Sequence, residues 1–127
     1  MDDEEKKNLI NSYVDAYNSF DIDGMTVHVH PDIIFKNFMN GEETAKAEGA
    51  EQFRQLADKS KALFVYRHQN ITKLDITGDT AKVNVVHEGI LAADHPSGVK
   101  AGEPLTLNGQ SEFEFKDGKL FKITDSS

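Results

Sequence analysis

The stretch that most constrains the fold of this chain runs from residue 80 to residue 123 and predicts three long antiparallel strands. Side chains on one side of its first part are mostly apolar, at the period of two that a pleated strand imposes. These positions are Ala81, Val83, Val85, His87, Gly89 and Leu91. Residues 105–115 alternate likewise, and residues 116–119 predict a tight hairpin that returns the chain along residues 120–123. Strands this long twist and curl, so we expect a sheet with a concave side that can hold a small ligand.

The residues before this stretch predict three helices. Apolar side chains recur at helical spacing from Leu9 to Tyr17, after a run of acidic residues that suits a helix N-terminus. A second, shorter helix is expected over residues 22–30, because Pro31 disfavours helical backbone angles at the residue before it. A third helix is expected over residues 50–63.

The other predicted strands cover residues 32–39, 42–46 and 64–77. Asn40-Gly41 is a hairpin signal between the first two. In the third, the parity of the apolar residues changes between Gln69 and Lys73, which predicts a bulge. Residues 94–103 are rich in Gly and Pro, and we expect a loop there that is a candidate lid.

Composition sets the outer limits. With 127 residues and no compositional break, we expect one domain over residues 1–127. The chain has no Cys, which excludes disulfides, thiolate metal ligands and thiol nucleophiles. The net charge is −8 and the 14 basic residues are scattered, which argues against a nucleic-acid partner. The acidic start, followed by no long apolar run, predicts neither a secretory signal nor a membrane span, and so a cytoplasmic protein.

This order of elements predicts an α+β fold. Three helices of the N-terminal half would pack on a strongly curved antiparallel or mixed sheet that forms a cone with an internal pocket. Residues 13–21 (YVDAYNSFD), 30–35 (HPDIIF) and 113–120 (FEFKDGKL) resemble the nuclear transport factor 2-like superfamily and, within it, the SnoaL-like branch. The resemblance implies a cone with a pocket and frequently a homodimer. Members include isomerases, dehydratases, epoxide hydrolases, cyclases and non-catalytic binding modules, so the fold constrains function weakly.

Ketosteroid isomerase is the relative whose acid–base groups are easiest to place. The resemblance puts its oxyanion-binding tyrosine on Tyr13, its general-base aspartate on Asn37 and its second carboxylic acid on Asn108. An amide cannot take up a proton at useful pH, so we do not expect that activity. A polar set of Tyr13, Asn37 and Asn108 remains, able to orient a carbonyl or hydroxyl. Strand parity leaves Asn108 open, because it shares a face with Glu112 unless a bulge shifts the register.

His87 is the candidate for acid–base chemistry, because an imidazole can give and take a proton near neutral pH and its strand register points it inward. The alternative is a core histidine whose ring is hydrogen-bonded by the backbone or a tyrosine. In the strand over residues 64–77, either His68 or Gln69 can point inward. An inward Gln69 would form a neutral hydrogen-bonding wall with Asn37.

Aromatic and apolar side chains supply candidate pocket walls, with a purely structural core role as the alternative. They are Tyr17, Phe35, Phe38, Met39 and Phe53. His28 and His30 form a His-x-His pair that suggests a metal site, but at the end of a helix such rings diverge by about 200°. No third ligand stands at motif spacing, and we expect neither a metal nor another cofactor.

Two functions remain open. The first is an isomerase, cyclase or hydratase that acts on a small apolar, carbonyl- or hydroxyl-bearing substrate, with His87 carrying the proton. The second is a non-catalytic module that binds a small molecule in the same pocket. On the opposite face of the same strand, Val86 and Ile90 alternate with polar residues. We expect a homodimer through this convex face.

Overall fold

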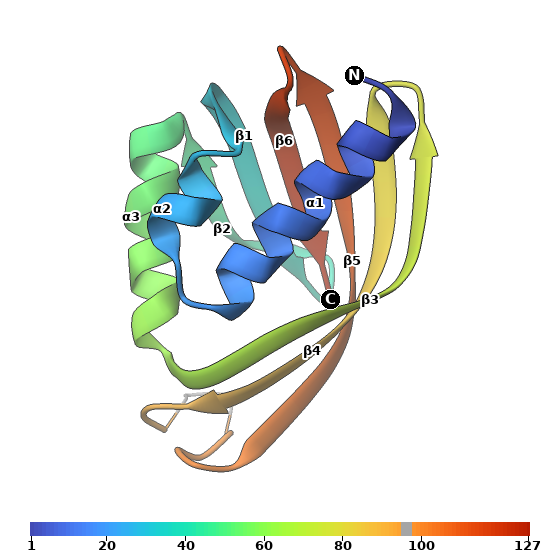
Figure 1. The fold of residues 1–127 in the computed structure, drawn as a ribbon. Coiled ribbons are helices and arrows are strands. Elements are labelled where there is room, and N and C mark those ends of the chain that lie inside the picture. The colour runs from blue at the N-terminus through green and yellow to red at the C-terminus, as the bar shows by residue number, and fades with distance from the viewer. Residues whose placement is uncertain (95–97) are drawn as a thin grey trace.

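The computed structural model describes residues 1–94 and 98–127, and Figure 1 shows helices packed on one side of a curved sheet. The helices are α1 (Asp3–Asn18), α2 (Ile22–Thr26) and α3 (Ala50–Ala62). The strands are β1 (Val29–Met39), β2 (Glu42–Glu48), β3 (Phe64–Thr77), β4 (Thr80–Leu91), β5 (Pro104–Lys116) and β6 (Lys119–Ser126). The predicted α+β class and the order of its elements are confirmed.

One mixed sheet contains every described strand, in the order β2-β1-β6-β5-β4-β3. β1 and β6 run parallel, and all other neighbours are antiparallel. In Figure 1 α1 crosses in front of the middle of the sheet and α3 stands on the side of β1 and β2. The sheet therefore curves around a space that α1 and α3 cover.

The core lies between α1 and the concave face of the sheet. The inward positions of β4 are buried as the alternation predicts, with Ala81 and Val83 each 1% exposed. Ile10 of α1 is fully buried against them. Asp2 caps α1, because its carboxylate accepts the Glu5 N–H at 2.8 Å. The helix is thus held by its apolar face and begins where the sequence supplies a cap.

Both predicted hairpins close on pairs of residues with positive φ. Asn40 and Gly41 have φ of 53° and 81°, and Asp117 and Gly118 have φ of 55° and 73°. These are the backbone angles that two-residue turns require, and they match the twist of the flanking strands.

The predicted bulge in β3 is confirmed. The pairing of β3 with β4 shifts register between Ile71 and Lys73. Before the shift, Arg67 and Gln69 pair with inward residues of β4, and after it Leu74 pairs with inward Val83. The bulge therefore keeps the same face of β3 turned inward along the whole strand.

The predicted second helix is wrong in its extent. It ends at Thr26, and β1 begins at Val29 and contains Pro31. Pro31 has no N–H to donate to a neighbouring strand. It is tolerated because it lies where β1 shifts register against β6, between Val29 and Ile34, and no β1–β6 hydrogen bond is required of it there.

The predicted loop over residues 94–103 falls partly on residues 95–97, which lie outside the described residues. Within the described part of the chain, no helix is long and apolar enough to span a membrane.

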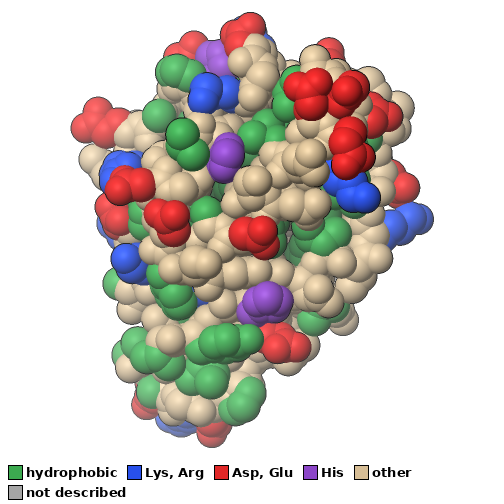
Figure 2. Space-filling view, viewed as in Figure 1, with side chains coloured by type: hydrophobic (Ala, Val, Ile, Leu, Met, Phe, Trp, Pro, Cys, Tyr) green, Lys and Arg blue, Asp and Glu red, His purple; other side chains and the backbone are tan. Residues whose placement is uncertain are grey.

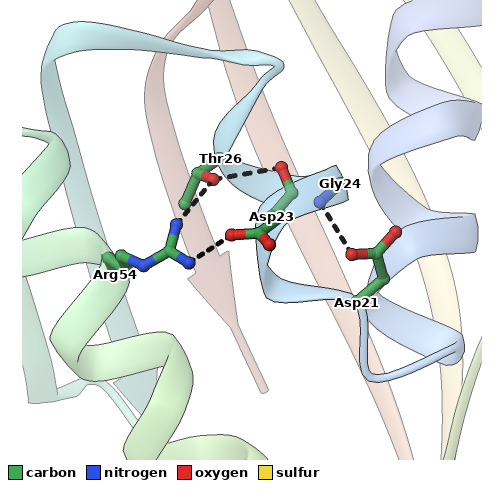
Figure 3. Close-up of polar contacts among 5 residues, drawn as sticks. All are labelled: Asp21, Asp23, Gly24, Thr26 and Arg54. Carbon is green, nitrogen blue, oxygen red and sulfur yellow. Dashed lines mark hydrogen bonds and ion pairs between the residues drawn. The ribbon is translucent and has the colours of Figure 1, made fainter.

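Figure 3 shows how α3 is tied to α2. The guanidinium of Arg54 on α3 pairs with the Asp23 carboxylate and donates to the Thr26 hydroxyl at 3.2 Å. Asp21 caps α2 by accepting the Gly24 N–H at 2.9 Å. These groups are largely exposed, so they fix the relative position of the helices more than they contribute to stability.

The packing of α1 on the sheet can be tested by Ile10→Ala, which we expect to lower the free energy of unfolding by about 2–5 kcal/mol because it leaves a cavity in the core. Urea unfolding followed by far-UV circular dichroism measures the change. Ser12→Ala, on the exposed side of the same helix, is the control and should change stability by about 0.5 kcal/mol or less. Equal effects of the two substitutions would contradict this packing.

Candidate functional site

A cavity of about 600 Å³ lies between the helices and the concave face of the sheet. Its walls come from α1, α3 and strands on both halves of the sheet. Apolar lining residues include Val14, Met25, Phe35, Phe53, Leu56, Val85, Leu107, Phe113 and Ile123. The polar lining residues include Tyr13, Tyr17, Asn37, Ser60, Arg67, Gln69, His87, Ser111 and Asp125. A mostly apolar wall with a few polar groups is the usual composition of a small-molecule site.

Tyr17 and His87 form a hydrogen-bonded pair on this wall. The Tyr17 hydroxyl lies 2.9 Å from Nε2 of His87. Burial, the Arg67 charge and the His68 charge lower the pKa of His87 below its usual 6.5, so the imidazole is neutral at physiological pH. Burial raises the pKa of Tyr17 to about 12. A tyrosine therefore hydrogen-bonds the His87 ring, as expected for a structural histidine, but the Tyr17–His87 pair also faces the cavity.

Asp125 on β6 brings a carboxyl group into the cavity. The Ser111 hydroxyl on β5 donates to its Oδ1 at 2.6 Å. Burial raises the pKa of Asp125 to about 6, although the Ser111 hydrogen bond acts in the opposite direction. A carboxyl group with this pKa changes its protonation state close to neutral pH, which is the property that a general acid or base needs.

Tyr13 stands on the same wall as Asp125. It is 7% exposed, and its ring contacts Phe113 edge-on at 6.1 Å between centroids. Burial and the Asp125 charge hold the pKa of Tyr13 well above 10. Its hydroxyl therefore stays protonated, and no hydrogen-bond partner of it is found among residues 1–94 and 98–127.

Arg67 on β3 is a further ionisable group that lines the cavity, in addition to Lys59 on α3. Its side chain is 1% exposed, and its Nε donates to the Tyr17 carbonyl at 2.9 Å. The guanidinium stacks over the Tyr17 ring at 3.8 Å and the Phe20 ring at 4.6 Å. Burial lowers its pKa, but a guanidinium remains charged at any physiological pH.

The structure brings most of the predicted site residues together. Besides the two tyrosines and His87, the cavity is lined by Phe35, Asn37, Met39, Phe53 and Gln69, whereas Phe38 is not among its lining residues. The Asn37 amide donates to the Thr44 hydroxyl at 2.7 Å, so it is already held at the β1–β2 edge. Between the two candidates on β3, Gln69 faces the cavity and His68 is exposed.

Asn108 is not brought into the cavity. It is exposed and lies opposite Val86 on the convex face. The pairing of β4 with β5 is continuous from Thr80 to Ile90, so no bulge reverses the parity of Asn108. The neighbouring Gly109 lines the cavity in its place.

Sequence reasoning missed Arg67, Ser111 and Asp125. Asp125 follows inward Ile123 by two positions, but the last strand was expected to end at Ile123. Arg67 lies two positions before Gln69 and therefore on the same face of β3. The sequence did not show which face of β3 points inward, so Arg67 could not be placed. Ser111 has the parity of buried Phe113 and Phe115. Ser111 and Asp125 could have been found by extending the inward–outward alternation of their strands to the polar positions beside the apolar ones, and Arg67 in the same way once the inward face of β3 was known.

The predicted His-x-His pair forms no metal site in the described residues. His30 is buried in β1, where its Nδ1 accepts the Asp32 N–H at 3.0 Å and its Nε2 lies 3.1 Å from the Asp117 carboxylate. His28 lies in the turn before the strand. Across the described residues, no group of three or more His, Cys, Asp or Glu side chains is arranged to hold a metal ion.

Comparison with known proteins agrees with this architecture. The model of the SnoaL-like domain family matches residues 10–123, and the chain therefore belongs to that family. No curated protein matches the chain by sequence.

Solved structures share the fold at low sequence identity. IdmH from Streptomyces antibioticus, a candidate polyketide cyclase, is 15% identical with a TM-score of 0.78 over 94% of this chain and 88% of that one. An LEH-like epoxide hydrolase from M. tuberculosis is 14% identical with a TM-score of 0.77 over 97% and 82%. TerC, co-crystallised with polyporic acid, is 16% identical with a TM-score of 0.75 over 95% and 89%. At these identities the likeness establishes the fold alone.

The environment of Asp125 predicts a pH-dependent change in stability. Because its pKa is raised in the folded state, its ionisation disfavours folding, and the protein loses stability as the pH rises from 3.8 to about 6. Asp125→Asn removes this cost and keeps an oxygen for Ser111. At about pH 7.5 we expect the variant to be more stable than the wild type by roughly 1–3 kcal/mol.

This advantage should vanish near pH 4, where the wild-type carboxyl is protonated when folded. Urea unfolding at a series of pH values measures it. Glu112→Gln removes an exposed carboxylate from β5 and is the control, with no such pH-dependent gain. An Asp125→Asn variant that is equally or less stable at neutral pH would show that Asp125 is not destabilised by burial.

Proposed function

We propose that this protein binds a small, largely apolar, carbonyl-bearing molecule in the cavity and catalyses proton transfer on it, as an isomerase or cyclase does. The observation that carries the proposal is Asp125, a carboxyl group with a pKa of about 6 on an otherwise mostly apolar wall. A carboxylate with this pKa is a competent base at neutral pH and can return the proton as the conjugate acid.

Asp125 takes the role of proton carrier in this proposal, and His87 takes a positioning role. The imidazole is neutral, and its Nε2 is engaged by Tyr17. In the tautomer that carries hydrogen on Nε2, His87 donates to the Tyr17 oxygen and leaves the Tyr17 O–H to donate into the cavity. The ring thus sets which hydrogen bond Tyr17 can offer to a ligand.

The reaction begins with removal of a proton from the carbon next to the substrate carbonyl by Asp125. The electron pair of the broken C–H bond moves toward the carbonyl oxygen, which becomes an enolate oxygen. Tyr13 keeps its proton because of its high pKa, and its hydroxyl donates to that oxygen, assisted by Tyr17. In a β,γ-unsaturated substrate the enolate is a dienolate, and return of the proton from Asp125 to its far carbon gives an isomer. In a substrate with a second carbonyl, attack of the enolate carbon on it closes a ring, and Asp125 returns the proton to the new alkoxide.

Proteins of similar structure support this choice. A candidate polyketide cyclase and an epoxide hydrolase share the fold, and TerC, which also shares it, was co-crystallised with polyporic acid. The alternative function is non-catalytic binding of the same class of molecule. The two differ in whether Asp125 acts as a base.

Proton exchange on 2-tetralone tests the catalytic role. In D₂O, the wild type should accelerate exchange of the protons next to the ketone, with a rate that rises with pH around 6 as Asp125 ionises. Asp125→Asn should lower the enzymatic rate by about 10²–10⁴-fold. Proton NMR follows the exchange, and Glu112→Gln is the control that keeps the rate. Binding of 2-tetralone without acceleration over buffer would make the protein a non-catalytic binder.

We further propose that the chain is a single domain that forms a homodimer in the cytoplasm, without a nucleic-acid partner. Basic side chains are scattered among acidic ones on the face in Figure 2. On the convex face, Val86 and Ile90 are only partly buried, and the exposed Tyr66 pairs with Ile90 across the sheet. This apolar surface, turned away from the cavity, is the proposed contact with a second copy.

Light scattering coupled to size exclusion tests the assembly. The wild type should elute with twice the chain mass of 14.1 kDa. Val86→Lys should give the monomer mass, because a charge would be buried in the contact. Gln55→Lys, on the exposed side of α3, is the control and should remain dimeric. A wild-type monomer would contradict the proposal.

A further inference from the structure

Arg67 is a buried charge for which the described residues supply no counter-ion. It is 1% exposed, and no carboxylate within 4.0 Å of it is found among residues 1–94 and 98–127. Its Nε donates to a backbone carbonyl, and its Nη1 lies 3.4 Å from the Ser60 hydroxyl, a long contact. Its Nη2 is buried and has no hydrogen-bond partner in the described part of the chain. Buried charges in proteins are normally paired, so this guanidinium is incompletely satisfied.

The position of Arg67 is nevertheless tightly defined. The rings of Tyr17 and Phe20 lie 3.8 Å and 4.6 Å from its Cζ, and the Tyr17 carbonyl accepts from its Nε. Cation–π contacts of this kind favour a guanidinium without neutralising it. The side chain is therefore held in one orientation, in which Nη2 lacks an acceptor among the described residues and Nη1 has only the long contact with Ser60.

We propose that the molecule bound in this cavity carries a planar oxygen anion, such as a carboxylate or an ionised enol, that pairs with the Nη1–Nη2 edge of Arg67. The anion displaces the Ser60 hydroxyl from Nη1 and supplies the missing acceptor for Nη2. A two-point hydrogen bond between a guanidinium and a planar anion is the geometry that arginine favours. The inference rests on the proposed function only in taking the same cavity as the ligand site.

The sheet order places this anion far from the proposed base. Arg67 is on β3 and Asp125 is on β6, with β4 and β5 between them. Three strand spacings amount to about 14 Å along the sheet, and less across its concave side. A ligand that reaches both groups has its acidic group at one end and its reacting carbon at the other, as a molecule of two or three fused rings would. This separation also keeps the anion away from the Asp125 carboxylate.

Calorimetric titration with paired aromatic probes tests the inference. The probes are 2-naphthoate and anthracene-2-carboxylate, each compared with its primary amide. The wild type should bind each carboxylate at least about tenfold more tightly than its amide. Arg67→Met should abolish this preference, and Lys61→Met, which removes an exposed charge from α3, should keep it. Equal affinities in the wild type, survival of the preference in Arg67→Met, or no binding of any probe at millimolar concentration would overturn the proposal.

The wild-type protein supplies a second readout that does not depend on a folded variant. The Arg67 charge lowers the pKa of His87, so an anion that neutralises this charge should raise that pKa. Histidine NMR titration with saturating 2-naphthoate should show the increase, and the amide should not produce it. An unchanged His87 pKa with bound carboxylate would place the anion elsewhere.

Thermal unfolding separates a ligand role from a structural one. Without ligand, Arg67→Met should melt at the wild-type temperature or above, because it removes an unpaired buried charge. A large loss of stability would assign Arg67 to the fold and overturn the inference. Carboxylate selectivity that needs Arg67, together with 2-tetralone exchange that does not need Asp125, would retain this inference and reject the proposed catalysis. Carboxylate selectivity that does not need Arg67, together with 2-tetralone exchange that needs Asp125, would reject this inference and retain the proposed catalysis.

Discussion

The cavity depends on how α1 is attached to β3 at both of its ends. Near its start, the buried Lys6 ammonium donates to the Gly78 carbonyl at 2.5 Å, beyond the end of β3. Near its end, the Asn18 amide exchanges two hydrogen bonds with the Gln69 backbone, at 2.7 Å and 3.1 Å. Between these points Ile10 is buried against the core. The helix is therefore fixed along the strand while the curvature of the sheet leaves space beneath the second half of the helix.

Burial affects the polar groups of this space in different ways, according to whether each can become neutral. It raises the pKa of Asp125 and lowers that of His87, so both neutral forms are favoured. Tyr13 keeps its proton for the same reason. Arg67 cannot lose its charge at physiological pH, and burial therefore leaves it as a permanent cation. The cavity combines groups that exchange protons with one that can only bind an anion, and this division suggests separate roles in chemistry and in recognition.

Much of the fold could be predicted because local patterns and tertiary packing agree. The period of two placed His87 inward, the change of parity located the bulge in β3, and Asn40-Gly41 and Asp117-Gly118 marked both hairpins. Prediction failed where an element continued past its apolar residues. β6 runs to Ser126 because its parallel pairing with β1 continues there, and this brings Asp125 inward. Pro31 lies within a strand because a register shift accommodates it.

By itself, the sequence determined the order of the elements, the inward face of β4 and the exclusion of thiol chemistry, because these follow from side-chain type and spacing along the chain. Only the tertiary structure decided that Asp125 is paired with Ser111, that His87 is engaged by Tyr17 and that Arg67 is buried with no carboxylate partner among residues 1–94 and 98–127. Each of these depends on which residues of distant strands and helices meet, and on how much water their contacts exclude. A shifted pKa or a missing counter-ion is a property of that environment, and spacing along the chain does not encode it directly.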